Sequence, residues 1–299
     1  MTVDALPTAT MPHRDPVRID RAAWLALPAV IFVLALFIFP FGYGLVLSFT
    51  PLDKAAGWLA NYTKFFSDPA YYATIGKTLW LALPATLINV GASVPIAYRM
   101  RVPSGGQRFV TTLLVIPITL GTVLVADGLL TYLGPQGWVN RTLMGLGLID
   151  GPVRLVHNYT GVLLSLIVSG FPFTFLLTLS YITGIDPVLA QAARTLGAGP
   201  WRQFKEIYFP LLLPGLAVAF CLTFVQAFSV FPSAVLLGAP AGATRVISIA
   251  AYEAAFENYD FPMASAVAMI MGLVQLVITV TVLSGRRLVY RGPVGGGKG

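Results

Sequence analysis

The sequence predicts an all-α membrane protein with about six membrane-spanning helices. Of its 299 residues, 57% are hydrophobic and only 10% are charged, and the mean hydropathy is +0.79. A soluble domain cannot cover so much apolar surface with polar side chains. A span needs roughly 20 mostly apolar residues to cross about 30 Å of hydrocarbon. Apolar runs of that length lie near residues 24–48, 78–98, 109–132, 161–184, 211–237 and 263–284.

The first run is expected to stay in the chain as a membrane anchor. It is longer than the apolar core of a signal peptide, and no small-residue cleavage site follows it. Arg14, Arg18 and Arg21 precede it. The expected parts of the chain are a cytoplasmic N-terminal segment (1–23), a six-helix transmembrane domain (24–284) and a flexible cytoplasmic tail (285–299).

The distribution of basic residues predicts that both termini lie in the cytoplasm, because basic loops are held on that side during insertion. With the N-terminus inside, 13 Lys and Arg residues fall on the cytoplasmic side and 6 on the outer side. The net charge of +7 is therefore mainly a signal of topology. No cluster of basic and aromatic residues suggests nucleic-acid binding.

The connections expected outside are the longer ones, at about 50–77, 134–160 and 239–262. The last of them carries an acidic cluster, Glu253, Glu257 and Asp260, which could dock a partner on that side. A solvated loop explains the same charges. Cys221 is the only cysteine and lies in an apolar run, so we expect neither a disulfide nor a metal site.

The inner connection between the fourth and fifth runs predicts a folded element. Asp186 followed by Pro187 is typical of a helix start, since Asp caps free backbone N–H groups and Pro suits the first helical position. Apolar residues then recur at helical spacing on one face: Leu189, Ala192, Ala193 and Leu196. A folded element of this size suggests docking to another molecule.

A tight turn and a second helix are expected next. Gly197 can end the first helix in a left-handed conformation, and Gly199 and Pro200 make the break. Residues 201–208 form a second amphipathic piece, before Pro210 opens the next span.

Residues 186–210 contain Gln191-Ala192-Ala193, three residues, Gly197, nine residues, and then Ile207-Tyr208-Phe209-Pro210. This spacing closely resembles the EAA loop of permease subunits of type I binding-protein-dependent ABC importers, and we call residues 186–210 the coupling loop after it. Gln191 stands where that family usually has Glu, and Phe209 where it usually has Leu. Outlying matches are Asn61-Tyr62, the Gly-x-x-Gly-x-x-Asn run from Gly134 to Asn140, and Leu236-Leu237-Gly238.

The resemblance implies the type I importer permease fold, with the first helix of the coupling loop seated in a groove of a separate ATPase. The residues it implies in this coupling are Asp186, Gln191, Ala192, Ala193, Leu196, Gly197, Ile207 and Pro210. It further implies an ATPase dimer, a second and different permease subunit, an extracytoplasmic solute-binding protein and a bacterial inner membrane. The competing interpretation is a hairpin that packs only on its own chain.

No catalytic residue is expected. The C-terminal GPVGGGKG, Gly292 to Gly299, imitates a phosphate-binding loop, but Gly299 replaces the Ser or Thr that would bind magnesium. No strand precedes it and no helix follows, so we expect a tail. ATP and magnesium are therefore expected on the partner ATPase, and no cofactor on this chain.

The predicted substrate path begins with Asp127, in the third run. An ionised carboxylate at the centre of a span costs roughly 2.5 to 3.5 kcal/mol, so it should face a protein interior or a watery cavity. A buried partner or a position near the outer interface also explains it. In the fifth run, Gln226, Ser229 and Phe231 add polar and aromatic character where a bent helix could line a path. Core packing is the competing interpretation there.

The solute is expected to be small, polar and cationic. Residues 236–238 and the layout with a single coupling loop look most similar to spermidine and putrescine permeases. The Asp127 carboxylate could balance the charge of a cation. Iron(III), thiamine, aminophosphonate and sugar permeases are alternatives. A secondary transporter should show coupling-ion sites or inverted repeats, and neither is evident.

Overall fold

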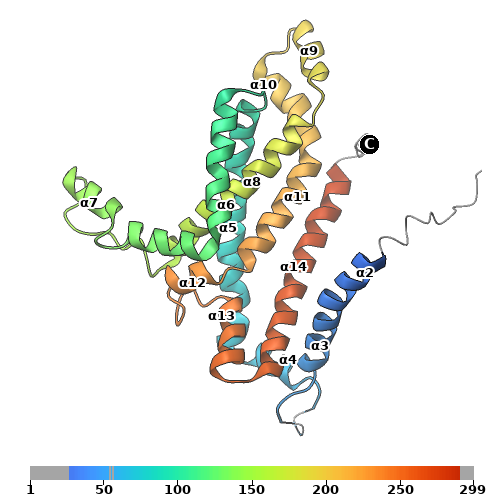
Figure 1. The fold of residues 1–299 in the computed structure, drawn as a ribbon, viewed down its shortest axis with the longest axis vertical. Coiled ribbons are helices and arrows are strands. Elements are labelled where there is room, and N and C mark those ends of the chain that lie inside the picture. Colours follow the sequence, from blue (N-terminus) through green and yellow to red (C-terminus); the bar gives the residue numbers. More distant parts are fainter. Residues whose placement is uncertain (1–26, 54, 56, 290–299) are drawn as a thin grey trace, which may run out of the picture. The chain divides into compact units, whose positions relative to one another are not determined.

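The structure is a computed structural model that describes residues 27–289, apart from residues 54 and 56. Across these residues the chain is helical and forms no strand. Six of the described helices are long and apolar enough to cross a membrane (Figure 1): Leu27–Ser48, Pro69–Arg99, Gly105–Gly145, Tyr159–Thr183, Pro200–Phe228 and Phe261–Gly285. The prediction of an all-α protein with six spans is confirmed. The predicted N-terminal segment 1–23 lies outside the described residues, and so do residues 290–299 of the predicted tail 285–299. Residues 285–289 of that tail instead continue the last helix, Phe261–Val289.

The chain divides into two compact units, residues 1–46 and 47–299. The first unit supplies most of the first span, in which α2 (Leu27–Val33) is followed by a π-helical turn (Leu34–Ile38) and α3 (Phe39–Ser48). Its large side chains are exposed, for example Phe37 at 69%. An all-round apolar and exposed helix of this length suits contact with lipid.

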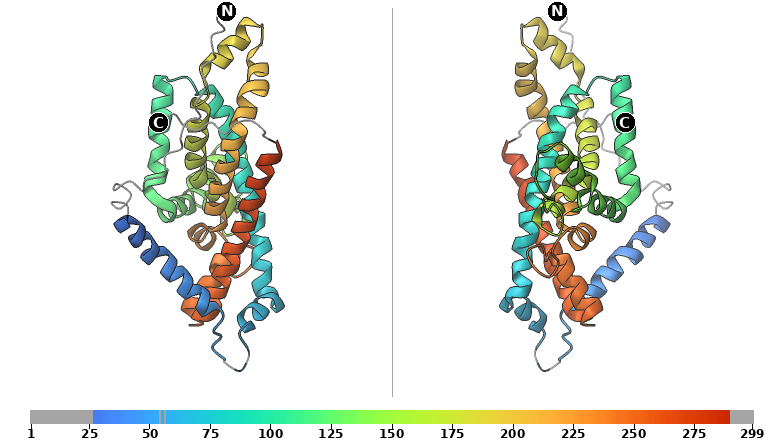
Figure 2. Two further views of the ribbon diagram at one scale, coloured as in Figure 1. Left: turned by 90° about the vertical axis from the view of Figure 1, so that its right-hand side faces the viewer. Right: turned by 90° about the vertical axis from the view of Figure 1, so that its left-hand side faces the viewer.

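The second unit is built around α5 (Pro69–Arg99), α8 (Tyr159–Thr183) and α11 (Phe209–Phe228), which pack against one another (Figure 2). α6 (Gly105–Leu133) packs on α8, and α14 (Phe261–Val289) packs on α11. α5, α8, α11 and α14 contribute to an apolar cluster that includes Leu81, Phe224 and Phe228.

Pairs of hydroxyl side chains join the three inner helices. Ser93 of α5 lies 2.9 Å from Thr178 of α8, and Thr174 of α8 lies 2.7 Å from Thr223 of α11. In hydrocarbon such groups need partners inside the protein, so small hydroxyl residues at helix contacts both allow close approach and hydrogen-bond across it. These four hydroxyl side chains therefore lie at contacts between the three helices.

The predicted limits of the fifth span were wrong at both ends. The second piece of the coupling loop does not stop before Pro210: α10 (Pro200–Gln203), a π-helical turn (Phe204–Tyr208) and α11 form one continuous helix. At the other end α11 stops at Phe228, and a separate short helix, α12, spans Pro232–Leu236.

The connections expected outside also contain helices that their mixed composition did not predict. They are α4 (Ala60–Ser67), α7 (Trp138–Gly145), α13 (Ile247–Tyr252) and a π-helical turn (Glu253–Glu257). The second span begins at Pro69, earlier than expected, because Asp68 accepts a hydrogen bond from the Ala70 N–H at 2.8 Å and so caps α5.

Candidate coupling loop and translocation cavity

The coupling loop has the helix start and the turn that its sequence predicts. The Asp186 carboxylate accepts a hydrogen bond from the Val188 N–H at 2.9 Å, and Pro187 is the first residue of α9 (Pro187–Thr195). Gly197 has φ of +79°, and its N–H donates to the Arg194 carbonyl at 2.9 Å. A residue with a side chain would be strained there, so Gly197 fixes the angle at which the chain leaves α9.

The apolar face of α9 points away from the rest of the chain. Leu189 is 45% exposed and Leu196 is 87% exposed, whereas Ala190 on another side of the helix is buried. Ala190 belongs to a cluster with Tyr208 and Leu212. α9 is therefore held to its own chain by one side and leaves its leucines uncovered on the other.

Two residues that the sequence did not single out hold the turn of the coupling loop. Gln203 is 2% exposed, and its Nε2 donates to the Ala198 carbonyl at 2.7 Å. Tyr98, at the end of α5, donates its hydroxyl hydrogen to the Pro200 carbonyl at 3.0 Å and packs its ring against Phe204 at 4.8 Å between centroids. The turn is thus tied to the second span.

The remaining residues that the resemblance implies in coupling lie along the same loop. Gln191 and Ala192 are exposed, and Ala193 and Ile207 are half-buried. Pro210 is the second residue of α11, directly after the π-helical turn. The loop therefore presents α9 outward, while its second leg continues into a span.

A cavity of about 360 Å³ lies between α6, α8 and α11, and we call it the α11 cavity. Gln226 and Ser229, both expected on a substrate path, line it together with Ser169 and Thr122. Gly121, also in the lining, has φ of +75° and interrupts α6 with a non-helical residue. A span broken beside a cavity is typical of sites where irregular backbone lines a path.

The other two predicted path residues lie outside this lining. Asp127 is exposed and sits on α6, six residues beyond Gly121. Phe231 lies in the break after α11 and packs its ring 5.1 Å from that of Tyr252. Gln275, which the sequence did not suggest, donates to the Ser229 hydroxyl at 2.8 Å and so brings α14 to the edge of the cavity.

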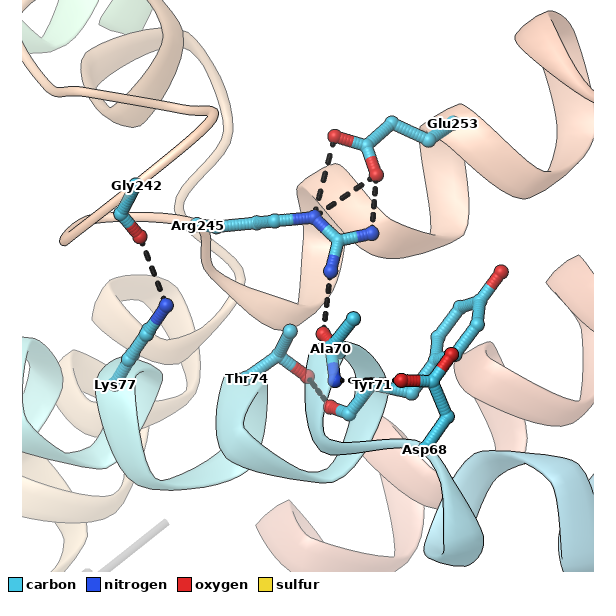
Figure 3. Close-up of polar contacts among 8 residues, drawn as sticks. All are labelled: Asp68, Ala70, Tyr71, Thr74, Lys77, Gly242, Arg245 and Glu253. Atoms are coloured by element: carbon cyan, nitrogen blue, oxygen red, sulfur yellow. Dashed lines mark hydrogen bonds and ion pairs between the residues drawn. The ribbon is translucent and has the colours of Figure 1, made fainter.

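At the opposite end of the second unit, Arg245 joins the connection expected outside, residues 239–262, to α5 (Figure 3). Its Nε donates to the two carboxylate oxygens of Glu253 at 3.0 and 3.3 Å, and another nitrogen donates to the Ala70 carbonyl. Lys77 donates to the Gly242 carbonyl at 2.8 Å. The hydrogen bond to Glu253 raises the pKa of Arg245. We call these contacts the outer network.

The predicted acidic cluster is mostly engaged within the chain. Glu253 belongs to the outer network, and Asp260 lies 3.8 Å from Lys64 and accepts a hydrogen bond from the Met263 N–H at 3.0 Å. Glu257 is exposed. Two of the three carboxylates therefore have structural partners.

The sequence matches the family described as binding-protein-dependent transport system inner membrane component over residues 104–290. It is 30% identical to the spermidine/putrescine transport system permease protein PotB of Escherichia coli, over 73% of this chain and 80% of that protein. It is 29% identical to the probable sulfate transport system permease protein of Prototheca wickerhamii, over 71% and 81%.

Among solved structures, the fold is similar to a chain of a bacterial alginate ABC transporter in complex with an alginate pentasaccharide-bound periplasmic protein. The TM-score is 0.77 at 24% identity, and the match covers 91% of this chain and 96% of that chain. The family match covers more than half of the sequence, and the six spans agree with it. The chain therefore belongs to the binding-protein-dependent inner membrane components, as a multi-pass permease subunit of the type I ABC importer fold.

Proposed function

We propose that this chain pairs with a different permease subunit to form the path for a small, polar, cationic organic solute. A solute-binding protein delivers the solute outside, and an ATPase dimer that binds ATP and magnesium drives transport from the cytoplasm. Both termini and the coupling loop lie on the cytoplasmic side. The observation that carries the proposal is the uncovered apolar face of α9.

That face is costly to leave in water. Burying one leucine side chain is worth about 1.5–3 kcal/mol, and Leu196 keeps 87% of its surface exposed. α9 is also held at a defined angle, by the Asp186 cap at one end and by Gly197 at the other. A rigid helix with an exposed apolar stripe fits into a groove of a partner without first having to be ordered.

Movement of the coupling loop can reach the α11 cavity through a single helix. Pro200–Phe228 is continuous over 29 residues. At 1.5 Å per residue it is about 43 Å long. Its first turn contacts Tyr98, and its last turns carry Gln226. We propose that closure of the ATP-bound ATPases pushes α9, rocks this helix and turns the cavity outward, and that hydrolysis resets it.

Replacing Leu196 by Asp tests the docking. The side chain is exposed in this chain, so the fold should be unchanged, while a buried charge at the interface should abolish co-purification of the ATPase. Leu52→Asp, at another exposed leucine (67%) outside the coupling loop, is the matched control. Equal recovery of the ATPase with both variants would contradict docking through α9.

The proposed class of solute rests on two observations. One relative is a spermidine/putrescine permease, and Asp127 offers a carboxylate on the broken helix beside the cavity. The lining named above, Gln226, Ser229, Ser169 and Thr122, supplies neutral hydrogen-bonding groups. In this proposal Asp127 attracts the cation, and the neutral groups hold the rest of the solute by hydrogen bonds.

Asp127→Asn tests the solute class in the assembled importer. For putrescine or spermidine we expect KM to rise about 10- to 150-fold, because one charge-assisted contact is worth about 1.5–3 kcal/mol. Asp150→Asn, an exposed carboxylate outside the spans, should leave KM unchanged. Unaltered uptake kinetics in Asp127→Asn would contradict a role for Asp127 in binding a cation and would favour the aminophosphonate or sugar alternatives.

A further inference from the structure

A second cavity, of about 520 Å³, lies between the end of α5 and the coupling loop. Three arginines line it: Arg99 and Arg101 from the end of α5 and the residues that follow, and Arg194 from α9. Its aromatic lining consists of Tyr98, Trp201 and Phe204. We call it the arginine cavity.

No carboxylate within the described residues neutralises these arginines. The ion pairs found there are Lys64–Asp260, Arg202–Glu206 and Arg245–Glu253. A cavity with three guanidinium groups and no acid attracts an anion. The planar guanidinium group of arginine matches the geometry of phosphate oxygens and can donate two parallel hydrogen bonds to one phosphate.

One of the three arginines is already held in place. The Nη1 of Arg101 donates to the Tyr98 carbonyl at 2.6 Å, and its guanidinium lies 4.0 Å from the centre of the Tyr98 ring and 5.1 Å from that of Tyr208. Stacking of this kind orders the side chain before a ligand arrives, which lowers the entropic cost of binding.

The walls of the cavity belong to membrane-spanning helices. Pro95 and Tyr98 lie in the last turns of α5, and Phe204 lies in the first turns of the helix that becomes the fifth span. Trp201 is 73% exposed beside them. Amphipathic aromatic rings and arginines at the end of spans are typical of the headgroup level of a bilayer. The lining therefore suits a charged group attached to an apolar chain.

The cavity is separate from the face of α9 proposed to dock the ATPase. Arg194 lies four residues from the buried Ala190 and hence on the same side of α9, whereas Leu189 and Leu196 are exposed on the other side. An ATPase seated on the leucines would thus leave the arginines on the far side of the helix.

We propose that the arginine cavity binds the phosphate headgroup of an anionic phospholipid from the inner leaflet. Basic pockets between spans on the cytoplasmic side are suited to such headgroups. The proposal rests on the proposed orientation, with the coupling loop inside. A headgroup there bridges the end of α5, α9 and the start of the fifth span, so the importer couples its ATPase to its spans better in anionic membranes.

Binding of phosphatidylglycerol and phosphatidylcholine to the purified full-length chain, followed by native mass spectrometry, tests the proposal. The variant Arg99→Gln/Arg194→Gln removes two exposed arginines of the cavity and leaves the stacked Arg101 in place. The control Arg141→Gln/Arg154→Gln removes two exposed arginines elsewhere. Each basic residue near an anionic headgroup contributes about 1 kcal/mol, which is about fivefold in affinity. The cavity variant lacks two of them and should bind phosphatidylglycerol about 25-fold more weakly.

The expected result is that loss, with phosphatidylcholine binding and the control variant unchanged, and with no displacement of the lipid by millimolar inorganic phosphate. Equal phosphatidylglycerol affinity in the cavity variant overturns the proposal. Displacement by inorganic phosphate overturns it in favour of a site for a soluble anion. Loss of ATPase co-purification with lipid binding intact assigns the arginines to the ATPase interface instead. Leu196→Asp tests ATPase docking alone, so its result does not bear on lipid binding by the purified chain.

Discussion

Two side-chain hydrogen bonds, one local and one long-range, hold the turn of the coupling loop. Gln203 reaches back to the Ala198 carbonyl, and Tyr98 reaches across from α5 to the Pro200 carbonyl. Both acceptors are backbone groups in the turn, so the angle between α9 and the following helix depends on side chains outside the family motif. The loop is therefore held by more than Gly197.

Gln203→Leu should loosen this turn. Leucine keeps the volume of the side chain but leaves the Ala198 carbonyl without its donor, at a cost of about 1 kcal/mol. Amide hydrogen exchange over residues 196–203 should then quicken about fivefold. Gln136→Leu, at an exposed glutamine in another connection, should change nothing. Unchanged exchange in Gln203→Leu would contradict this prediction and would show that Gly197 and Tyr98 hold the turn without Gln203.

Sequence reasoning located the residues whose role is local. Asp186 and Gly197 act on backbone groups within four residues, so spacing alone reveals them. Tyr98 contacts a carbonyl 102 positions away. A partner that distant leaves no periodic signal in a single sequence. Gln203 has a nearby partner, Ala198, but nothing in the amphipathic pattern separates it from its solvated neighbours.

At the scale of elements, Pro210 led to a wrong prediction of where the helix of the fifth span begins. Pro210 lacks the N–H of a helical residue and its ring crowds the carbonyl four residues earlier. The π-helical turn Phe204–Tyr208 widens the helix just before it, and the Phe209 N–H bonds to the Phe204 carbonyl. Pro40 likewise follows the π-helical turn Leu34–Ile38. A proline that sequence reasoning took as a helix start thus lies inside a longer helix.

The sequence alone also does not decide which side chains line the α11 cavity. Gln226 and Ser229, which the sequence suggests for a substrate path, line this cavity, and their role on a path stays a prediction. Asp127 and Phe231 were placed on the path because they lie in or near apolar runs. The break at Gly121 and the end of α11 at Phe228 decide which side chains reach the cavity. Neither break is visible in hydropathy.

Gly197→Ala should weaken ATPase binding through backbone strain alone. No atom lies within 4 Å of a Cβ built at Gly197, so the cost is that of its φ of +79°. A left-handed residue with a side chain costs about 1–2 kcal/mol, which corresponds to about 5- to 30-fold in affinity. Gly199 also has open space but a φ of −67°, so Gly199→Ala should bind normally. Equal affinities would mean that the turn adapts without loss.

At the scale of the whole second unit, the two ends are built for different tasks. One end presents α9 with its leucines uncovered, whereas the other is tied together by the outer network (Figure 1, Figure 3). α5 contributes to both ends, through Tyr98 at one and Ala70 at the other. The arrangement suits a rigid end at the outer network and a movable end at the coupling loop.

Glu253→Gln should weaken the outer network without affecting the coupling loop. The Arg245–Glu253 pair is about four-fifths buried, and losing the carboxylate leaves a guanidinium with a weaker partner. The expected cost is about 1–2 kcal/mol. Hydrogen exchange over residues 239–246 should rise, with ATPase co-purification unchanged. Glu257→Gln, at an exposed carboxylate four residues away, is the control. Loss of ATPase binding in Glu253→Gln would contradict the independence of the two ends.

The orientation of the chain is open to a direct test, because Cys221 is its only cysteine. In a Cys221→Ala background, Leu196→Cys and Leu52→Cys place single thiols at exposed positions in the coupling loop and in the first outer connection. If basic residues hold the coupling loop inside, a membrane-impermeant maleimide labels Leu196→Cys only in inside-out vesicles and Leu52→Cys only in right-side-out vesicles. The reverse pattern would place α9 where no ATP is available, and would contradict both the docking role and the inner-leaflet lipid site.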